Sequence, residues 1–196
     1  MSKKLLYFII HKPFKILSQF TDEDGNAGLG SVFELPKDIY PVGRLDLDSE
    51  GLLILTNDKK LNHQLLDPKK NHHRTYWVQV EGVPDEKALS QLIRGVTINV
   101  NGKQHLTKKA EVKKINVELP ERNPSINHAK HPITSWLEIS LTEGKNRQVR
   151  KMTAKVGHPT LRLIRVGIES LNLAPLESGE ITQISPKVLY KKLNIS

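Results

Sequence analysis

Cysteine is absent from this chain of 196 residues. Without cysteine the chain forms no disulfide, has no thiolate nucleophile and builds no cysteine zinc site. Long hydrophobic runs are missing too, because the longest, Leu5–Ile10, is far shorter than the roughly 20 residues that span a bilayer. Met1–Lys4 is basic, but no small-residue cleavage site follows, which argues against a secretory signal. We therefore expect a soluble protein, and the absence of cysteine fits a reducing compartment, although many secreted proteins also lack cysteine.

Acidic residues are outnumbered by basic ones. The chain has 21 Asp and Glu against 30 Lys and Arg, which gives a formal net charge of +9. Such an excess favours a polyanionic partner through long-range attraction and counterion release. Hydrophobic residues at 37% and charged residues at 26% are typical of a globular protein. The length suits a single domain over residues 1–196, organised around one core or as two lobes around a cleft.

Segments with strand character outnumber helical ones and do not alternate with them regularly, which favours an α+β fold with a mainly antiparallel, mixed sheet and flanking helices. Strands are expected at residues 5–10, 51–56, 75–80, 97–100, 110–119, 134–142 and 161–169, with a hairpin turn at Asn101–Gly102. Helices are expected after Asp58, after Asp85 (Leu89, Leu92 and Ile93 inward), and at residues 146–156 and 188–193. The loop at residues 120–132 is either a lobe boundary or an insertion at a binding surface.

The first segment that can carry chemistry is acidic and runs from Gly43 to Gly51, just before an expected buried strand. Loops that enter buried strands commonly place catalytic groups at the edge of a cleft. A solvated acidic turn explains the same pattern, and a metal site of Asp46, Asp48 and Glu50 is a third interpretation. The spacing does not match a calcium loop, because the glycine and the distal glutamate are misplaced.

The second segment, Glu143–Met152, is basic and predicts a helix that begins after a glycine turn, with Asn146 as its N-cap. Helical spacing separates an apolar face from a basic one. The apolar face carries Val149, Met152 and Val156, and the basic face carries Arg147, Arg150, Lys151 and Lys155. Arginine in the first turn opposes the helix dipole, which favours an anionic partner there. A basic face that is merely solvated is the alternative.

The third segment is Arg74–Trp77, at the start of an expected strand. An aromatic side chain beside a cation can stack on an unpaired base and hold its phosphate. Core packing is the alternative for either aromatic, although a regular strand turns only one of Tyr76 and Trp77 toward the core. The histidines have no metal-ligand spacing, so we interpret them as surface or RNA-facing groups.

Taken in this order, the segments resemble the pseudouridine synthases of the RsuA type. The likeness runs from about Tyr7 to about Gly179 and includes five motifs. They are His11–Pro13, Gly43–Thr56, Ile133–Leu137, Glu143–Met152 and Leu161–Arg165. One departure is Arg74, where the family often has lysine, and the positive charge is kept. Many members also carry an N-terminal S4 RNA-binding domain, which this sequence does not show.

The resemblance implies the pseudouridine synthase fold with a central RNA-binding cleft. It implies that Asp46 is the essential aspartate, that Arg150 pairs with it, and that Tyr76 stacks under the target uracil. Leu163 would form part of the pocket floor, and Arg44 would enter the RNA beside the extruded nucleotide. The remaining residues expected to contact RNA are Lys12, Arg74, Lys145, Arg147 and Lys151.

The same resemblance implies a cytoplasmic isomerase that acts on ribosomal RNA, with 23S as the expected molecule. We expect a monomer with no obligatory protein partner and no membrane association. The reaction exchanges one bond for another without redox change, so no cofactor or metal is expected. The sequence agrees, since it lacks a dinucleotide fingerprint and a phosphate-binding glycine loop.

An ionised carboxylate suits this chemistry, because it can attack C1′, stabilise charge there, or assist removal of a ribose proton. Burial alone would neutralise it, so a cation within about 4–6 Å is needed, and guanidinium is well suited. Stacking on Tyr76, worth roughly 1–3 kcal/mol, would offset much of the cost of extruding the base. Two rival hypotheses are a non-catalytic ribosomal-RNA-binding or assembly protein of the same fold, and a metal-dependent nuclease.

Overall fold

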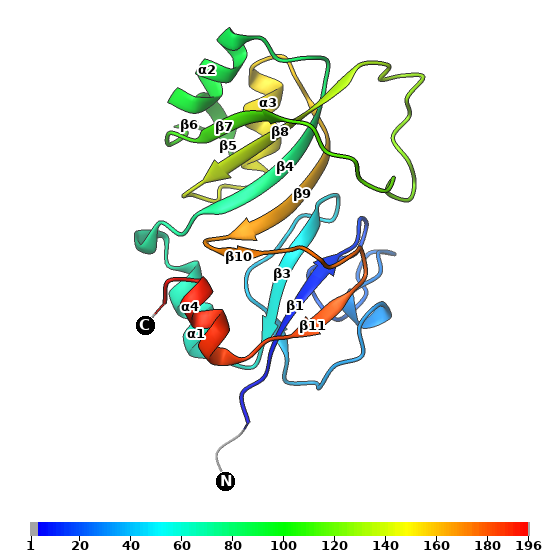
Figure 1. Ribbon diagram of the computed structural model, residues 1–196, viewed down its shortest axis with the longest axis vertical. Helices are drawn as coiled ribbons and strands as arrows, with labels where there is room; N and C mark the ends of the chain where they lie inside the picture. The colour runs from blue at the N-terminus through cyan, green and yellow to red at the C-terminus, as the bar shows by residue number, and fades with distance from the viewer. Residues whose placement is uncertain (1–3, 196) are drawn as a thin grey trace. The chain divides into compact units, whose positions relative to one another are not determined.

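A computed structural model describes residues 4–195 (Figure 1). Residues 1–3 and 196, with most of the basic start noted above, lie outside the described part. The chain divides into two compact units: residues 4–72 with 164–195, and residues 73–163. Strand β9 (Thr160–Ile168) crosses this boundary after Leu163. The loop at residues 120–132 lies wholly inside the second unit, so it is not the boundary between units.

The first unit contains a sheet in the order β11-β1-β3-β9, in which only the pair of β3 and β9 is parallel. Strand β3 is buried along its whole length, as its continuous apolar run predicted. The register of β1 against β3 places Lys12 opposite Gly51. The strands are β1 (Tyr7–Lys12), β2 (Tyr40–Pro41), β3 (Glu50–Thr56), β10 (Leu171–Asn172) and β11 (Ile181–Gln183). The helices are η1 (Leu29–Ser31), α1 (Lys59–Leu66), η2 (Pro68–Lys70) and α4 (Pro186–Lys192).

Asp58 caps helix α1, as the sequence predicted, and accepts hydrogen bonds from the backbone of Lys60 and Leu61. Its Oδ2 also accepts the hydroxyls of Tyr7 at 2.8 Å and Tyr190 at 2.6 Å. Burial raises the pKa of Tyr7 to about 12, helped by the adjacent carboxylate. Burial opposes ionisation of Asp58, but its hydrogen bonds outweigh burial and lower the pKa of the carboxyl group. One carboxylate therefore joins β1, α1 and α4.

The second unit contains a sheet in the order β9-β4-β8-β7 and a separate hairpin of β5 and β6. The turn at Asn101–Gly102 joins that hairpin, as predicted. The strands are β4 (Arg74–Glu81), β5 (Thr97–Val100), β6 (Lys103–Leu106), β7 (Glu111–Ile115) and β8 (Thr134–Leu141). The helices are α2 (Glu86–Arg94) and α3 (Gln148–Lys155). With the first unit, this confirms the α+β class with mainly antiparallel pairing.

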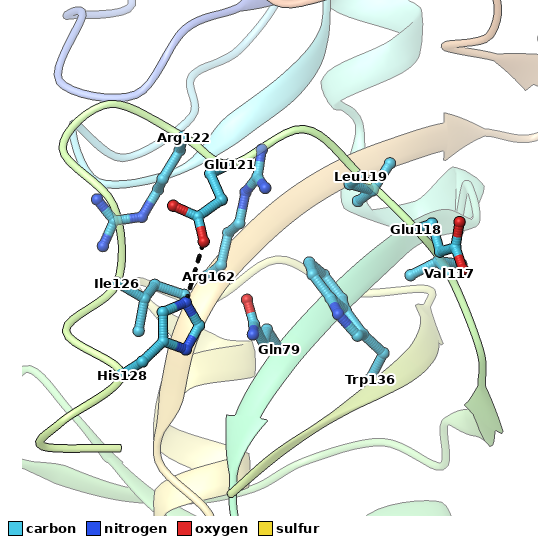
Figure 2. A pocket seen from close by; sticks show the side chains of 10 residues that line it. All are labelled: Gln79, Val117, Glu118, Leu119, Glu121, Arg122, Ile126, His128, Trp136 and Arg162. Atoms are coloured by element: carbon cyan, nitrogen blue, oxygen red, sulfur yellow. Dashed lines mark hydrogen bonds and ion pairs between the residues drawn. The ribbon is translucent and has the colours of Figure 1, made fainter. Parts of the chain in front are cut away.

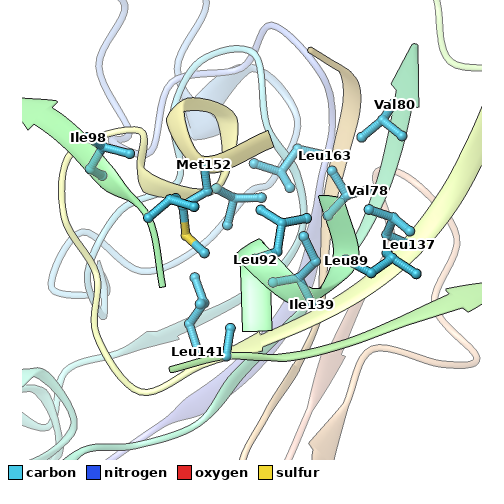
Figure 3. Close-up of a cluster of buried hydrophobic side chains, with 13 residues drawn as sticks. Val78, Val80, Leu89, Leu92, Ile98, Leu137, Ile139, Leu141, Met152 and Leu163 are labelled. Carbon is cyan, nitrogen blue, oxygen red and sulfur yellow. The ribbon is translucent and has the colours of Figure 1, made fainter. Parts of the chain in front are cut away.

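The core of the second unit lies between one face of its sheet and helices α2 and α3 (Figures 1 and 3). Strand residues Val78 and Val80 pack there with Leu89 and Leu92 of α2 and Met152 of α3. Alternation along β4 therefore turns its odd-numbered residues to the opposite face. The first unit has its own core of Ile10, Leu29, Phe33, Ile39, Leu45, Leu53 and Leu55.

Some local expectations were wrong. Ile93 is 41% exposed and does not join the core, because α2 buries only Ala88, Leu89 and Leu92. Asn146 does not cap α3, because Arg147 occupies that position with a left-handed backbone, φ 52°, and no side-chain cap. Strand β7 ends at Ile115, earlier than the apolar pattern suggested. Within residues 4–195, no helix combines the length and apolar character needed to cross a membrane.

Candidate functional site

The acidic segment of the first unit is anchored through Leu45. The hydroxyl of Ser18 donates to the Leu45 carbonyl oxygen at 2.8 Å and accepts from its amide at 2.9 Å. Leu45 is buried in the core, whereas Arg44 before it is exposed and Asp46 after it is half-buried. A turn follows, closed by a 3.0 Å hydrogen bond from the Ser49 amide to the Asp46 carbonyl oxygen. The backbone thus presents Asp46 from a fixed position.

Lys12, at the end of β1, supplies positive charge to this segment. Its side chain has no exposed surface, and Nζ donates to the carbonyl oxygens of Pro13 at 2.9 Å and Ile16 at 2.6 Å. Burial lowers the pKa of Lys12 to about 8, against the attraction of Glu50, Asp48 and Asp46. The ammonium is therefore protonated at neutral pH. A buried lysine cannot contact RNA directly, so this placement departs from the role we expected for Lys12.

Gly51 lets strand β9 approach the acidic segment closely. Gly51 has φ +108°, and a Cβ there would collide with the carbonyl oxygen of Arg165. Arg165 is buried and its Nε donates to the Leu52 carbonyl oxygen at 2.8 Å. The parallel pairing of Gly51 with Arg165 follows from this approach. Within the first unit, the acidic segment therefore lies between Lys12 on β1 and the last part of β9.

The acidic segment gives no support to the metal interpretation. Across residues 4–195, no three His, Asp or Glu side chains are grouped so that they could hold a metal ion. Asp46, Asp48 and Glu50 instead attract the charge of Lys12. The spacing of these residues in the sequence also does not match that of a calcium-binding loop.

The basic segment of the second unit is organised by two residues that we did not single out, Glu143 and Gln148. The Gln148 amide donates to Glu143 Oε1 at 2.7 Å, and its Oε1 accepts from the Lys145 backbone at 2.9 Å. His105 lies 3.1 Å from the other oxygen of Glu143. Burial opposes ionisation, but these hydrogen bonds and that of Lys108 lower the pKa of Glu143. A glutamine that helical spacing places on the apolar side of the expected helix was the signal in the sequence that could have pointed to this role.

The basic side chains around α3 differ in exposure. Lys145 and Arg147 are exposed, whereas Arg150 and Lys151 are half-buried. Lys151 Nζ donates to Asn146 Oδ1 at 3.3 Å, which keeps its charge beside the loop. The opposite face of α3 buries Val149 and Met152 and packs Val156, as predicted. The helix therefore separates an apolar face from a basic one.

Tyr76 and Leu163 lie in the same apolar cluster of the second unit. Leu163, which is 6% exposed, and Met152 of α3 belong to this buried cluster. The half-buried Tyr76 packs against it. Arg74, two residues earlier on β4, is half-buried. The structure thus brings together three of the expected groups within this unit: an aromatic ring, an apolar floor residue and the helix that carries Arg150.

Comparisons with known proteins identify the family of this chain. Residues 6–155 match the family described as RNA pseudouridylate synthase. The chain is 47% identical over 178 residues to Ribosomal large subunit pseudouridine synthase E of Vibrio vulnificus strain CMCP6, covering 90% of this chain and 74% of the relative. It is 46% identical over 175 residues to the protein of that name from Xanthomonas campestris pv. campestris, and the alignment covers 88% of this chain and 91% of that relative.

A solved structure is similar as well. The protein described as "Crystal structure of pseudouridylate synthase" aligns with a TM-score of 0.77 and 25% identity, covering 98% of this chain and 75% of that one. A curated relative from Bacillus subtilis strain 168, Ribosomal large subunit pseudouridine synthase B, is 34% identical over 182 residues, covering 92% of this chain and 68% of the relative. The matched family region includes both the acidic and the basic segment.

Proposed function

The chain belongs to the RNA pseudouridylate synthase family, and on that premise we propose that it isomerises one uridine of structured 23S ribosomal RNA, with Asp46 as the catalytic carboxylate. The protein is an RNA pseudouridine synthase, an isomerase. The observation that carries the proposal is the family match over residues 6–155, which includes the segment that presents Asp46. A non-catalytic protein of the same fold is not favoured, because the relatives are named as synthases.

The reaction breaks the bond from N1 to C1′ and forms one from C5 to C1′, while C5 loses a proton and N1 gains one. Atoms and electrons balance without an added reagent. An ionised Asp46 would attack C1′, stabilise charge there, or assist loss of a ribose proton. Support comes from its half-buried position in a segment whose carboxylates interact electrostatically with the buried Lys12. We therefore propose that Lys12 acts on the carboxylates and does not bind RNA.

Arg150, Tyr76 and Leu163 would complete the chemistry. The pairing of Arg150 with Asp46 joins residues of different units and rests on the family resemblance. Guanidinium suits this role because it stays protonated and can bind a carboxylate through two hydrogen bonds. Tyr76 would stack under the uracil above Leu163, and its packing in the same cluster as Leu163 supports this assignment.

Basic side chains would hold the RNA around the extruded nucleotide. Arg44 is exposed beside Asp46 and would occupy the space that the base leaves. Arg74, Lys145, Arg147 and Lys151 would contact phosphates, in keeping with the net charge of +9. We further propose a monomer that acts in the cytoplasm, where ribosomal RNA is made, without an obligatory protein partner.

Substitution of Asp46 by Asn tests the assignment. We expect kcat for pseudouridine formation in a 23S transcript to fall by at least about 10³-fold, with RNA affinity kept, because the amide is the same size but carries no charge. The measurement is carbodiimide-blocked primer extension with purified protein. Asp48→Asn is the matched control and should stay within about tenfold of the unchanged protein. Full activity of Asp46→Asn would refute the assignment. Cleavage of the RNA that a chelator prevents would favour the metal-dependent nuclease.

A further inference from the structure

The second unit contains a pocket that the proposed reaction does not use. It lies beneath the loop that follows β7 and has a volume of about 290 Å³ (Figure 2). Its floor is formed by Gln79 of β4, Trp136 of β8 and Arg162 of β9, and the loop contributes Glu121 and His128. This volume falls near the lower end of known ligand sites and suits a single flat ring with its substituents.

The pocket opens on the sheet face opposite Tyr76 and Leu163. Tyr76 and Leu163 pack with the core beneath α2 and α3. Gln79 is three residues after Tyr76 on β4, and Arg162 directly precedes Leu163 on β9, so both point to the other face. Trp136 precedes the core residue Leu137 in the same way. The pocket is therefore separate from the proposed uracil site, although both belong to the second unit.

The polar groups of the pocket favour a neutral ligand that donates hydrogen bonds. The Gln79 side chain is 8% exposed, and its Nε2 donates to the Thr134 hydroxyl at 3.0 Å, so its carbonyl oxygen is the group presented to a ligand (Figure 2). Glu121, held 3.1 Å from His128, adds a second acceptor. Arg162 donates to the Pro120 carbonyl oxygen at 2.8 Å and braces the loop. Arginine and glutamate balance in the lining, which does not suit a phosphate group.

We propose that this pocket binds an unpaired RNA base that carries an exocyclic amino group. The half-buried indole of Trp136 supplies a stacking surface, and the amide oxygen of Gln79 accepts from the amino group. Uracil fits less well, because its single ring N–H lies between two carbonyl oxygens that face acceptors. The inference rests on the proposed function only for the identity of the ligand as RNA. It assigns the enzyme a second base contact, on the far side of the sheet from the reaction.

Fluorescence of Trp136 tests the proposal directly. The chain has two tryptophans, so Trp77→Phe leaves Trp136 as the only one. In that protein we expect pentaribonucleotides of adenosine and cytidine to quench the emission, and the uridine pentamer to bind about tenfold more weakly. Equal quenching by all three pentamers, or none at millimolar concentration, would overturn the proposal. Quenching by a peptide but by no nucleotide would overturn it in favour of a protein ligand.

Two variants in the Trp77→Phe protein sharpen the result. Gln79→Met keeps the size but removes the acceptor, and should bring the adenosine and uridine pentamers to within about twofold of each other. Asp46→Asn should leave quenching unchanged, so failure of the catalytic assignment and failure of this pocket are distinguishable. In otherwise unchanged protein, Trp136→Leu should raise KM for a 23S transcript about tenfold with little change in kcat. If Gln79→Met does not fold, the base preference of the Trp77→Phe protein decides alone.

Discussion

Replacement of Lys12 by Met should change how stability depends on pH. The folded-state pKa of Lys12 is about 8 against 10.5 for an ordinary lysine, so above pH 8 the unfolded chain binds more protons than the folded one. The contribution of Lys12 to stability must then rise with pH in this window. For these two pKa values, lysine titration adds about 2 kcal/mol to the free energy of unfolding between pH 8 and 10. Lys12→Met should lack that increment.

The assay is urea unfolding followed by far-ultraviolet circular dichroism at several pH values from 7 to 10. Tyr7 and Tyr190, whose pKa values are raised, begin to lower stability as the pH approaches 10, but they do so equally in all the proteins compared and cancel in the difference. Lys15→Met is the matched control, since Lys15 is exposed and nearby, and its curve should run parallel to that of the unchanged protein. If Lys12→Met also runs parallel, to within about 0.5 kcal/mol, the buried ammonium does not have a lowered pKa and the reasoning is wrong.

Three further predictions follow from single contacts. Asp58→Ala should lower the free energy of unfolding by about 2–4 kcal/mol at pH 7, because two tyrosine hydroxyls and two backbone amides lose their acceptor. Because the pKa of the Asp58 carboxyl group is lowered in the folded protein, this difference from the unchanged protein should shrink in acid. Urea unfolding at pH 7 and at pH 3 would measure both effects. Gly51→Ala should cost several kcal/mol through its collision with Arg165, whereas Gly25→Ala, with no atom within 4 Å, should cost only about 1 kcal/mol, so equal urea midpoints would contradict the close approach. Arg150→Lys should lower kcat by about 10²-fold with KM nearly kept, measured by primer extension, and an unchanged kcat would remove Arg150 from the chemistry.

The elements with strong local signals were predictable. The cap at Asp58 and the helix after Asp85 were predicted because an N-cap side chain bonds amides only two or three residues ahead. The buried strand at residues 50–56 followed from its uninterrupted apolar run. The acidic and basic segments were found because their residues are contiguous. Their roles in the reaction stay predictions.

Features that depend on tertiary packing were not predictable. The complete burial of Lys12 was missed because lysine is almost never buried, and only the pairing of β1 with β3 brings it within electrostatic reach of three carboxylates. The left-handed cap at Arg147 was missed because asparagine is the better cap by local preference. The pocket was missed because it forms only when the loop after β7 folds over Gln79 and Trp136.

Both tryptophans of the chain, Trp77 and Trp136, lie in the second unit, on strands β4 and β8. Their emission therefore reports the loss of structure in that unit alone, whereas circular dichroism sums over the whole chain. Two-state unfolding requires the two signals to change together. A comparison of the two curves would therefore reveal, without any label or mutation, whether the halves of this protein melt as one cooperative body or in sequence.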